Sequence, residues 1–476
     1  MRSQRRKLIT LALGGAVGLL VLVTVAVRVL VNVNRYKPRF EANASDILGM
    51  DVRVGGRLGL GFFPGFHVTV EDGRLLGQQG EVVVSAKRTR LYVDLLPLLR
   101  REFRLSRVDL RQLEVSIERD TLGRTNVRRL KTAALLEALD GASVSVSGGT
   151  LRYADRKTGG GFEATDVGLS VSRLRRTGGR SSRLLHGLSL KAELNCGEIR
   201  AKDFSVSAVK ASANGRDGLI VLEPVTLRVF GGQASGSFRA DVSDTIPRYQ
   251  ARCSLPRFRI EEFLETLSPT KVVEGTMDFS ASLSMQGTTG AQMAQTAAGE
   301  ISLRGDDLTL AGHDLDREIS RFKSSQSFNL VDVGAIFLAG PMGLAVTKGY
   351  NFASLFKGSG GNSRINTLVS HWRVEHGVAQ ARDVAFATAE NRIALQGGLD
   401  FVNGQFADVT VAVIDAKGCA KVRQAMRGSF AKPVVEKPDV LTTLAGPVLK
   451  LVKKTRGLFP GEPCEVFYSG SVAPPR

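Results

Sequence analysis

The chain has 476 residues, 43% hydrophobic and 23% charged, with a formal net charge of +19. This balance excludes a disordered chain, and the length allows two or three domains or one long repetitive one. Fifty-two glycines, against one Trp and six Tyr, predict many short strands and tight turns. The basic residues are scattered and form no nucleic-acid module, so we expect no nucleic-acid partner. Their charge suits anionic lipid head groups, or it forms a solvated basic surface.

An apolar segment near the N-terminus, Leu8 to Val27, contains no charged residue. A helix of that length is about 30 Å long and matches the hydrocarbon core of a bilayer, so we predict a transmembrane signal anchor at residues 8–33. The basic residues within 1–7 favour a cytoplasmic tail. A cleaved signal peptide is the alternative, because Thr24 and Ala26 are small enough to precede a cleavage site. Either interpretation places the body of the protein outside the cytosol.

The next region, residues 34–135, changes from a helical period to a period of two. A short amphipathic helix is predicted over Tyr36 to Leu48. Apolar and polar residues then alternate through several predicted strands, with an apolar corner at Leu95 to Leu99. The alternation slips by one residue near Arg107 and near Gln112, which predicts β-bulges or short bends.

The central region, residues 136–298, repeats this alternation. A helix-like interruption from Arg129 to Leu139 precedes its strands, and a helical connector is predicted over Pro256 to Leu267. The segment from Arg173 to Arg183 is rich in Arg, Ser and Gly, which predicts an exposed loop. The clearest strand is predicted from Gly275 to Gly287.

The C-terminal region, residues 299–476, contains further strands and a helix that Asp314 is predicted to cap. The apolar run Ala335 to Val346 is too short to span a bilayer, and it is either a buried segment or an insertion at the tip of the sheet. A basic amphipathic helix is predicted over Asp439 to Leu458. It either caps the open end of the sheet or rests on an anionic membrane, and the kink expected at Gly446-Pro447 favours capping.

No pattern points to catalysis. The sequence contains no Walker-type glycine loop, dinucleotide fingerprint or nucleophile elbow. His371 and His376 have the spacing of half a zinc site, but no Cys pair precedes them, which favours surface residues near a turn. Asp314 and Asp316 are typical of a helix cap or of solvated charge. We therefore expect no enzymatic activity, no cofactor and no metal.

Short motifs along the chain resemble the AsmA family in their order and spacing. They are Gly56 to Leu60, Phe63-Pro64, Val68 to Asp72, Leu95 to Leu99, Glu118 to Asp120, Gly123 to Asn126, Trp372 to Val374, Asp383 to Phe386, Arg392 to Leu395 and Gly398 to Phe401. The resemblance implies an anchor in the inner membrane of a Gram-negative bacterium and a periplasmic body made mostly of sheet. It also implies a relationship to the chorein-type lipid bridges.

The expected fold is mainly β with short helices: one transmembrane helix followed by an elongated, curled antiparallel sheet that forms a groove. Such a sheet must bury its apolar face against a second sheet or against lipid hydrocarbon. The resemblance favours the groove. We therefore expect a protein that binds phospholipid acyl chains and supports lipid transport and outer-membrane assembly, with the inner membrane, phospholipid and other envelope proteins as partners. The alternative is a scaffold that binds envelope proteins along its sheet edges and carries no lipid.

The candidate lining of the groove consists of apolar side chains that alternate along predicted strands. Each is either part of the lining or ordinary sheet core. They are Leu58, Leu60, Phe62, Val68, Val70, Val225, Leu227, Val229, Phe238, Phe279, Leu283 and Leu399.

Four cysteines occur, at positions 196, 253, 419 and 464, with no CxxC pair. In an oxidising periplasm, Cys419 and Cys464 are candidates for a disulfide that encloses the predicted C-terminal helix. The alternative is that all four are buried thiols.

Overall fold

The structure is a computed structural model that describes residues 33–100, 104–127, 131–176, 187–202, 204–266, 273–325, 360–437, 439–440 and 464–475. The chain forms two compact units, Met1–Ile220 and Val221–Arg476. Within the described ranges, no helix combines the length and the apolar character needed to cross a bilayer. The predicted membrane span, Leu8 to Val27, lies outside these ranges.

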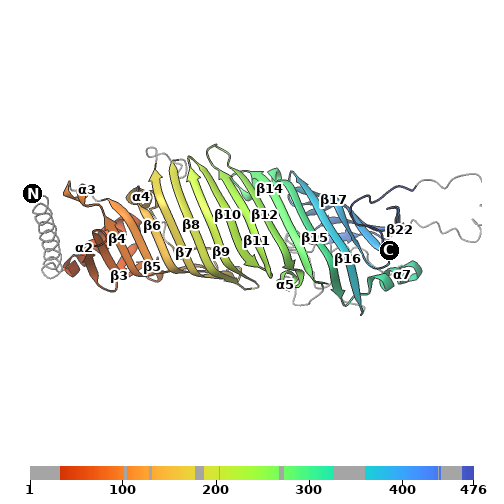
Figure 1. Ribbon diagram of the computed structural model, residues 1–476, viewed down its shortest axis with the longest axis horizontal. Coiled ribbons are helices and arrows are strands. Elements are labelled where there is room, and N and C mark those ends of the chain that lie inside the picture. Colours follow the sequence, from red (N-terminus) through yellow and green to blue (C-terminus); the bar gives the residue numbers. More distant parts are fainter. Residues whose placement is uncertain are drawn as a thin grey trace, which may run out of the picture. The chain divides into compact units, whose positions relative to one another are not determined.

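Unit 1 is a layer of strands with short helices at its margins (Figure 1). Its helices are η1 (Val33–Tyr36), α2 (Lys37–Leu48), α3 (Leu95–Leu99) and α4 (Thr132–Ala138). Its strands are β1 (Asp51–Val54), β2 (Leu58–Gly61), β3 (His67–Leu76), β4 (Val82–Val93), β5 (Leu105–Arg119), β6 (Ser143–Asp155), β7 (Gly160–Arg176), β8 (Leu188–Ala201) and β9 (Ser205–Arg216). The helix predicted over Tyr36 to Leu48 is confirmed as α2, and the interruption predicted at Arg129 to Leu139 contains α4.

The strands of unit 1 pair mostly in antiparallel order along the chain. Both β1 and β2 pair with β3 and together form one edge of the sheet. Antiparallel pairing continues from β3 to β5 and from β6 to β9. The pair β5 and β6 is parallel, which corrects the expectation of an entirely antiparallel sheet. The cause is the connection between these strands, which contains α4 and returns the chain to the end of the sheet where β5 began.

Two irregularities in β5 coincide with the predicted slips in alternation. Gln112 adopts a left-handed conformation with φ of 49°. It shifts the phase of the strand, so that Leu110 and Leu113 face the same side and line one cavity. A second register shift separates Leu105 from Arg107. The slip near Arg107 is therefore confirmed as a bulge. The slip near Gln112 is confirmed as a bend, because β5 keeps its register with β4 and β6 on both sides of it.

Unit 2 contains the remaining elements of the described chain. Its helices are α5 (Ile260–Glu265), α6 (Gly290–Thr296) and α7 (Leu315–Ser325). Its strands are β10 (Leu219–Val229), which begins in the last two residues of unit 1, β11 (Gly232–Asp241), β12 (Arg248–Arg259), β13 (Val273–Glu274), β14 (Thr276–Gln286), β15 (Ala298–Ala311), β16 (Asn362–Glu375), β17 (Val378–Ala387), β18 (Arg392–Asp400), β19 (Gln405–Ile414), β20 (Ala420–Ser429), β21 (Lys432–Val435) and β22 (Asp439–Val440). The connector predicted over Pro256 to Leu267 contains α5.

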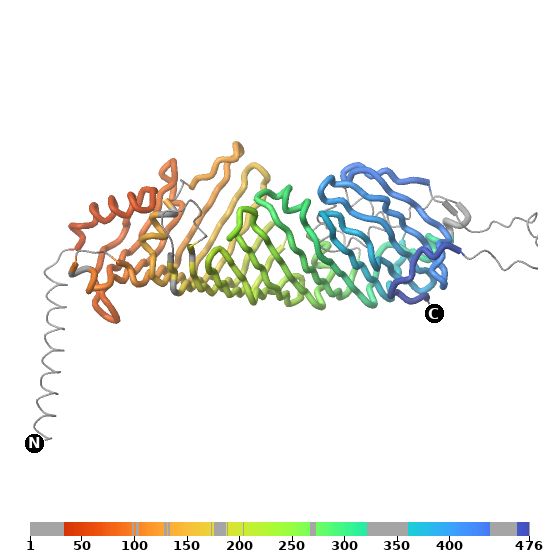
Figure 2. Tube along the Cα trace, turned by 90° about the horizontal axis from the view of Figure 1, so that it is seen from above, coloured from red at the N-terminus to blue at the C-terminus, as the bar shows by residue number. Residues whose placement is uncertain are grey.

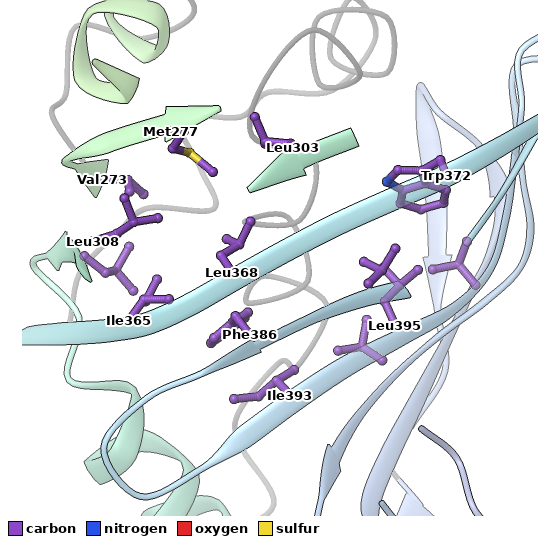
Figure 3. Packing of buried hydrophobic residues seen from close by; sticks show 14 of the residues in the cluster. Val273, Met277, Leu303, Leu308, Ile365, Leu368, Trp372, Phe386, Ile393 and Leu395 are labelled. Carbon is purple, nitrogen blue, oxygen red and sulfur yellow. The ribbon is translucent and has the colours of Figure 1, made fainter. Parts of the chain in front are cut away.

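The sheet of unit 2 curls and encloses a core. Antiparallel pairing joins β11, β12 and β14 to β20 in succession, while β13 pairs with β15 and the short strands β21 and β22 pair with β20. In Figure 2 the blue strands of this unit turn away from the plane of its green strands. Side chains from β14 to β20 therefore meet in one cluster, which Figure 3 shows around Met277, Leu368 and Phe386.

Helix α7 begins as predicted, because the Asp314 carboxylate accepts a hydrogen bond from the Arg317 backbone N–H at 3.1 Å. Other predicted segments fare differently. The loop predicted from Arg173 to Arg183 begins inside β7, and Asp439 is in β22 instead of the predicted helix. Residues 177–183 of the first segment, residues 441–458 of the second, and the whole of Ala335 to Val346 lie outside the described residues.

The C-terminal segment 464–475 packs against the other face of the curled sheet. Cys419 and Cys464, the pair nominated by the sequence, form a disulfide with 6.0 Å between their Cα atoms. Beyond it, the Tyr468 hydroxyl donates a hydrogen bond to the Asp383 carboxylate at 2.5 Å. The ring packs on the second buried cluster of this unit, which is rich in alanine. Of the other cysteines, Cys196 is a buried thiol and Cys253 an exposed one.

Candidate functional site

One face of the unit 1 sheet is apolar from strand to strand. Residues in register across the strands form two rows in which every member is apolar. The first row is Val52, Leu75, Val84, Val115, Leu151, Ala164, Ile199 and Val206. The second row is Leu60, Val68, Leu91, Val108, Val144, Val171, Ala192 and Ala213.

The opposite face of the same strands is polar. A row that lies one residue away from the second apolar row consists of Thr69, Arg90, Asp109, Ser145, Ser170, Glu193 and Ser212. Ion pairs cross neighbouring strands on this side, such as Arg152 to Glu163 at 2.7 Å. The alternation of side chains along each strand thus sorts the sheet into a solvated face and an apolar face.

The apolar face of unit 1 is open over much of its extent. Leu151, Ile199 and most other members of the two rows are only half-buried. On the same face, Leu194 is 39% exposed and Phe162 is 38% exposed. A layer packed against this face would bury such side chains almost completely, as happens in the core of unit 2. The face therefore presents a connected hydrocarbon surface.

Helix α2 covers the end of this face next to β1. Phe40, Ala44 and Leu48 point from the helix toward the sheet, and an apolar cavity of about 210 Å³ remains beneath them. Its floor is made mainly of aliphatic side chains, including Val84 and Leu110. Val52 and Val54 of β1 are buried here. Helix α2 therefore covers the cavity and also part of the apolar face next to β1.

In unit 2 a single row passes from an open region into a closed one. Its members are Phe238, Ala251, Leu283, Gly299, Val374, Ala379, Leu399 and Phe406. The first four are half-buried and the last four are buried. The change occurs between β15 and β16, where the sheet curls around the cluster that contains the fully buried Trp372. The apolar face of this unit is therefore half-open around Phe238, Ala251 and Leu283 on β11, β12 and β14. Phe258, Val273 and Met277 already belong to the core that the protein's own packing closes.

The residues nominated from the sequence divide along this boundary. Leu60, Phe62, Val68 and Phe238 are half-buried, as are the three β10 candidates Val225, Leu227 and Val229. Phe279 and Leu283 are half-buried at the margin of the closed core. Leu58 and Val70 are buried together in a small cluster that contacts α2. Leu399 is 1% exposed and is a core residue, because the curl of the sheet covers its face.

Several lining residues were not nominated from the sequence. In β12, Tyr249, Ala251 and Cys253 share the apolar face, since they pair with Met285, Leu283 and Ala281. Tyr249 also stacks on Phe238, with 6.2 Å between the ring centroids. The alternation in this strand was the signal for them, although the flanking Arg and Gln residues obscure it. Although Cys253 is exposed as a whole residue, partial desolvation by its neighbours raises the pKa of its thiol above the ordinary value.

The chemical groups of the described chain form no obvious catalytic arrangement. Among the described residues, no group of three or more His, Cys, Asp or Glu side chains is placed to hold a metal ion. His376 lies in the tight turn between β16 and β17 with φ of 51°, whereas His371 lies on β16 near Glu300. Asp316 accepts hydrogen bonds from the Thr388 hydroxyl at 2.6 Å and from the Asn391 amide at 2.7 Å, which is a structural role.

The comparison with protein families decides the relationship of this chain. The sequence profile of the AsmA family matches residues 2–183 and again residues 180–339. The chain belongs to the AsmA family. No curated protein matches it. In this AsmA-family chain the two matched stretches include the whole open apolar face of unit 1 and the half-open parts of β11, β12 and β14 in unit 2.

Proposed function

We propose that this AsmA-family protein is anchored in the inner membrane and holds phospholipid acyl chains against its open apolar face in the periplasm. The observation that carries the proposal is the row from Val52 to Val206, which is apolar in every strand and mostly half-buried. A connected apolar surface of this kind is unfavourable in water and typical of a binding surface. Lipid transport and outer-membrane assembly are the processes that such a protein would support.

Binding would need no covalent chemistry. Each methylene group that leaves water contributes about 0.8 kcal/mol, and apolar burial contributes about 25 cal/mol per Å². A flexible acyl chain can follow a row of Val, Leu and Ile side chains because dispersion and the hydrophobic effect have no strict direction. The charged face on the other side of the sheet is suited to contact with water, which leaves one face for hydrocarbon.

The closed core of unit 2 limits where acyl chains would lie. Leu368 and Trp372 are fully buried, and their neighbours on β17 and β18 are equally packed. The proposed binding surface therefore includes β3 to β9 of unit 1 and, in unit 2, the parts of β11, β12 and β14 around Phe238, Ala251 and Leu283. It excludes β13 and the faces of β16 to β20.

The scaffold alternative requires strand edges that can pair with another chain. At the β1 edge the outward amides already have partners: Val52 N–H donates to the Ser45 hydroxyl at 2.9 Å, and Val54 N–H donates to the Glu41 carboxylate at 2.8 Å. At the other end of the described sheet, β21 is short and contains Pro433, which cannot donate to a ladder. These features favour lipid binding over recruitment of proteins along the edges.

A photo-crosslinking experiment tests the proposal with two adjacent positions. Leu151 lies in the apolar row, and Arg152 is next to it in β6 on the charged face. A photoreactive residue at 151 should crosslink phospholipid in protein extracted from membranes, whereas the same residue at 152 should not. Equal lipid labelling at both positions, or none at 151 and none at Phe279, would reject the proposal.

A further inference from the structure

The charged face of unit 1 contains a concavity that the proposed function does not use. Its volume is about 450 Å³, and its lining consists of Lys87, Arg88, Arg111, Gln112, Ser147 and Gly148. Arg88 and Arg111 lie two residues from Arg90 and Asp109 on the same strands, so they share the charged face. The concavity is thus separated from the apolar rows by the thickness of the sheet.

The backbone shapes this concavity. Gln112 has φ of 49° and Gly148 has φ of 60°, and these left-handed residues lie opposite each other where β5 and β6 run parallel. Left-handed residues within a strand bend it and redirect its side chains, and here β5 and β6 keep their register through the bend. The concavity is consequently formed by the sheet itself and does not depend on a surface loop.

Two arginines lie directly opposite each other in this concavity. Arg88 of β4 and Arg111 of β5 are register partners, an arrangement in which like charges are destabilising. The next pair along the same face, Arg90 and Asp109, has opposite charges.

Another opposed arginine pair in this unit shows how such a conflict is normally relieved. Arg53 and Arg74 are also register partners. Each has its own carboxylate, since Arg53 contacts Asp51 at 3.2 Å and Arg74 contacts Asp72 at 2.8 Å. The ion pairs neutralise both guanidinium groups where they stand.

The concavity lacks this compensation. Glu71 approaches Arg88 at 4.0 Å, at the limit of an ion pair. Within the described part of the chain, no carboxylate pairs with Arg111 or with Lys87, and no acidic residue lines the concavity. A local excess of positive charge therefore surrounds a space that a small anion can enter.

We propose that this concavity binds a phosphate group through Arg88, Arg111 and Lys87, with the Gln112 amide and the Ser147 hydroxyl as neutral donors. A phosphate carries up to two charges and several acceptor oxygens, which matches opposed guanidinium groups better than a single carboxylate does. The phosphate belongs either to a soluble compound or to a lipid head group at a membrane surface. The inference is independent of acyl-chain binding, because it concerns the other face of the sheet.

The test compares the double variant K87Q/R111Q with R152Q/R200Q. Both remove two positive charges from the charged face of unit 1, but the second pair lies outside the concavity and its arginines are paired with Glu163 and Glu198. Binding of inorganic phosphate is measured by calorimetry. Binding to vesicles of phosphatidylcholine, with and without phosphatidylglycerol, is measured by flotation, and circular dichroism checks that each variant is folded.

We expect the K87Q/R111Q variant to bind phosphate at least about tenfold more weakly than wild type, and the R152Q/R200Q variant to bind it normally. That result supports a soluble source. If the wild type shows no measurable binding of inorganic phosphate, loss of binding to phosphatidylglycerol vesicles in K87Q/R111Q alone supports a lipid head group. Equal losses in both variants would mean that net charge alone acts and would overturn the proposal, as would a wild-type protein that binds neither probe.

Discussion

The Glu41 carboxylate accepts a hydrogen bond from the backbone N–H of Val54 at 2.8 Å, which fastens helix α2 to the outer edge of β1. The Ser45 hydroxyl accepts a hydrogen bond from the backbone N–H of Val52 in the same way, at 2.9 Å. The unpaired N–H and C=O groups of an edge strand can pair with another chain, so these side chains protect the β1 edge from such pairing.

Removing the Glu41 and Ser45 acceptors should leave the β1 edge free to pair with another chain. In the double variant E41A/S45A the amides of Val52 and Val54 lose their acceptors, at a cost of about 1–3 kcal/mol for each buried group left unsatisfied. We expect faster hydrogen exchange in β1 and concentration-dependent self-association, measured by light scattering after gel filtration. The variant N43A, on the exposed side of α2, should remain unchanged. Wild-type hydrogen exchange and wild-type elution of the double variant would show that the Glu41 and Ser45 side chains do not protect the β1 edge.

The cavity beneath α2 should accept the end of an acyl chain if the lipid proposal is correct. Replacing Ala44 by Trp places an indole in the 210 Å³ space. We expect lipid crosslinking from a photoreactive residue at Leu110 to fall several-fold, while crosslinking at Leu151 persists. The A44W variant should have a free energy of unfolding lower than wild type by about 1–3 kcal/mol, the usual cost of overpacking.

The matched control is Ala42→Trp, which adds the same side chain on the exposed side of the helix. It should leave crosslinking at Leu110 intact. Unchanged crosslinking in A44W would exclude hydrocarbon from the cavity without affecting the case for the open face.

The left-handed conformation of Gln112 predicts an unusual order of tolerance. A β-branched residue is strained at φ of 49°, so Gln112→Val should lower the free energy of unfolding by about 1–2 kcal/mol. Gln112→Gly should be nearly neutral, because glycine accepts this conformation while loosening the unfolded chain. Urea denaturation measures both, with Glu114→Val as the control on the same strand. If valine is tolerated equally at 112 and 114, the left-handed conformation of residue 112 carries no strain.

The same strand shows what can be read from sequence. The slips near Arg107 and Gln112 are visible because alternation is a local property of a few consecutive residues. The parallel pairing of β5 with β6 is not local, and neither is the opposition of Arg88 to Arg111 across two strands. Leu227 and Leu399 have similar alternating neighbours, yet one is half-buried and the other is in the core. Their difference depends on how the sheet curls, which alternation does not encode.

Tyr468 predicts a pH dependence for the attachment of the C-terminal segment. Burial raises the pKa of its hydroxyl, and the hydrogen bond to the Asp383 carboxylate raises it further. In the unfolded chain tyrosine titrates near an ordinary pKa of about 10. The unfolded state therefore releases this proton first, and the stabilisation from protonated Tyr468 is present below about pH 10 and is lost as the pH rises above it.

The variant Tyr468→Phe removes both this titration and the hydrogen bonds of the hydroxyl, which also accepts from Val472 N–H at 3.0 Å. At pH 8 it should be less stable than wild type by about 1–3 kcal/mol, because Asp383 and Val472 lose a partner. Between pH 10 and 11 the gap should narrow, since only the wild type loses stability through this group. Urea denaturation across this range measures the gap, with Tyr36→Phe as the exposed control. A gap that stays constant from pH 8 to 11 would mean that the Tyr468 proton is held no more tightly in the folded protein than in the unfolded chain.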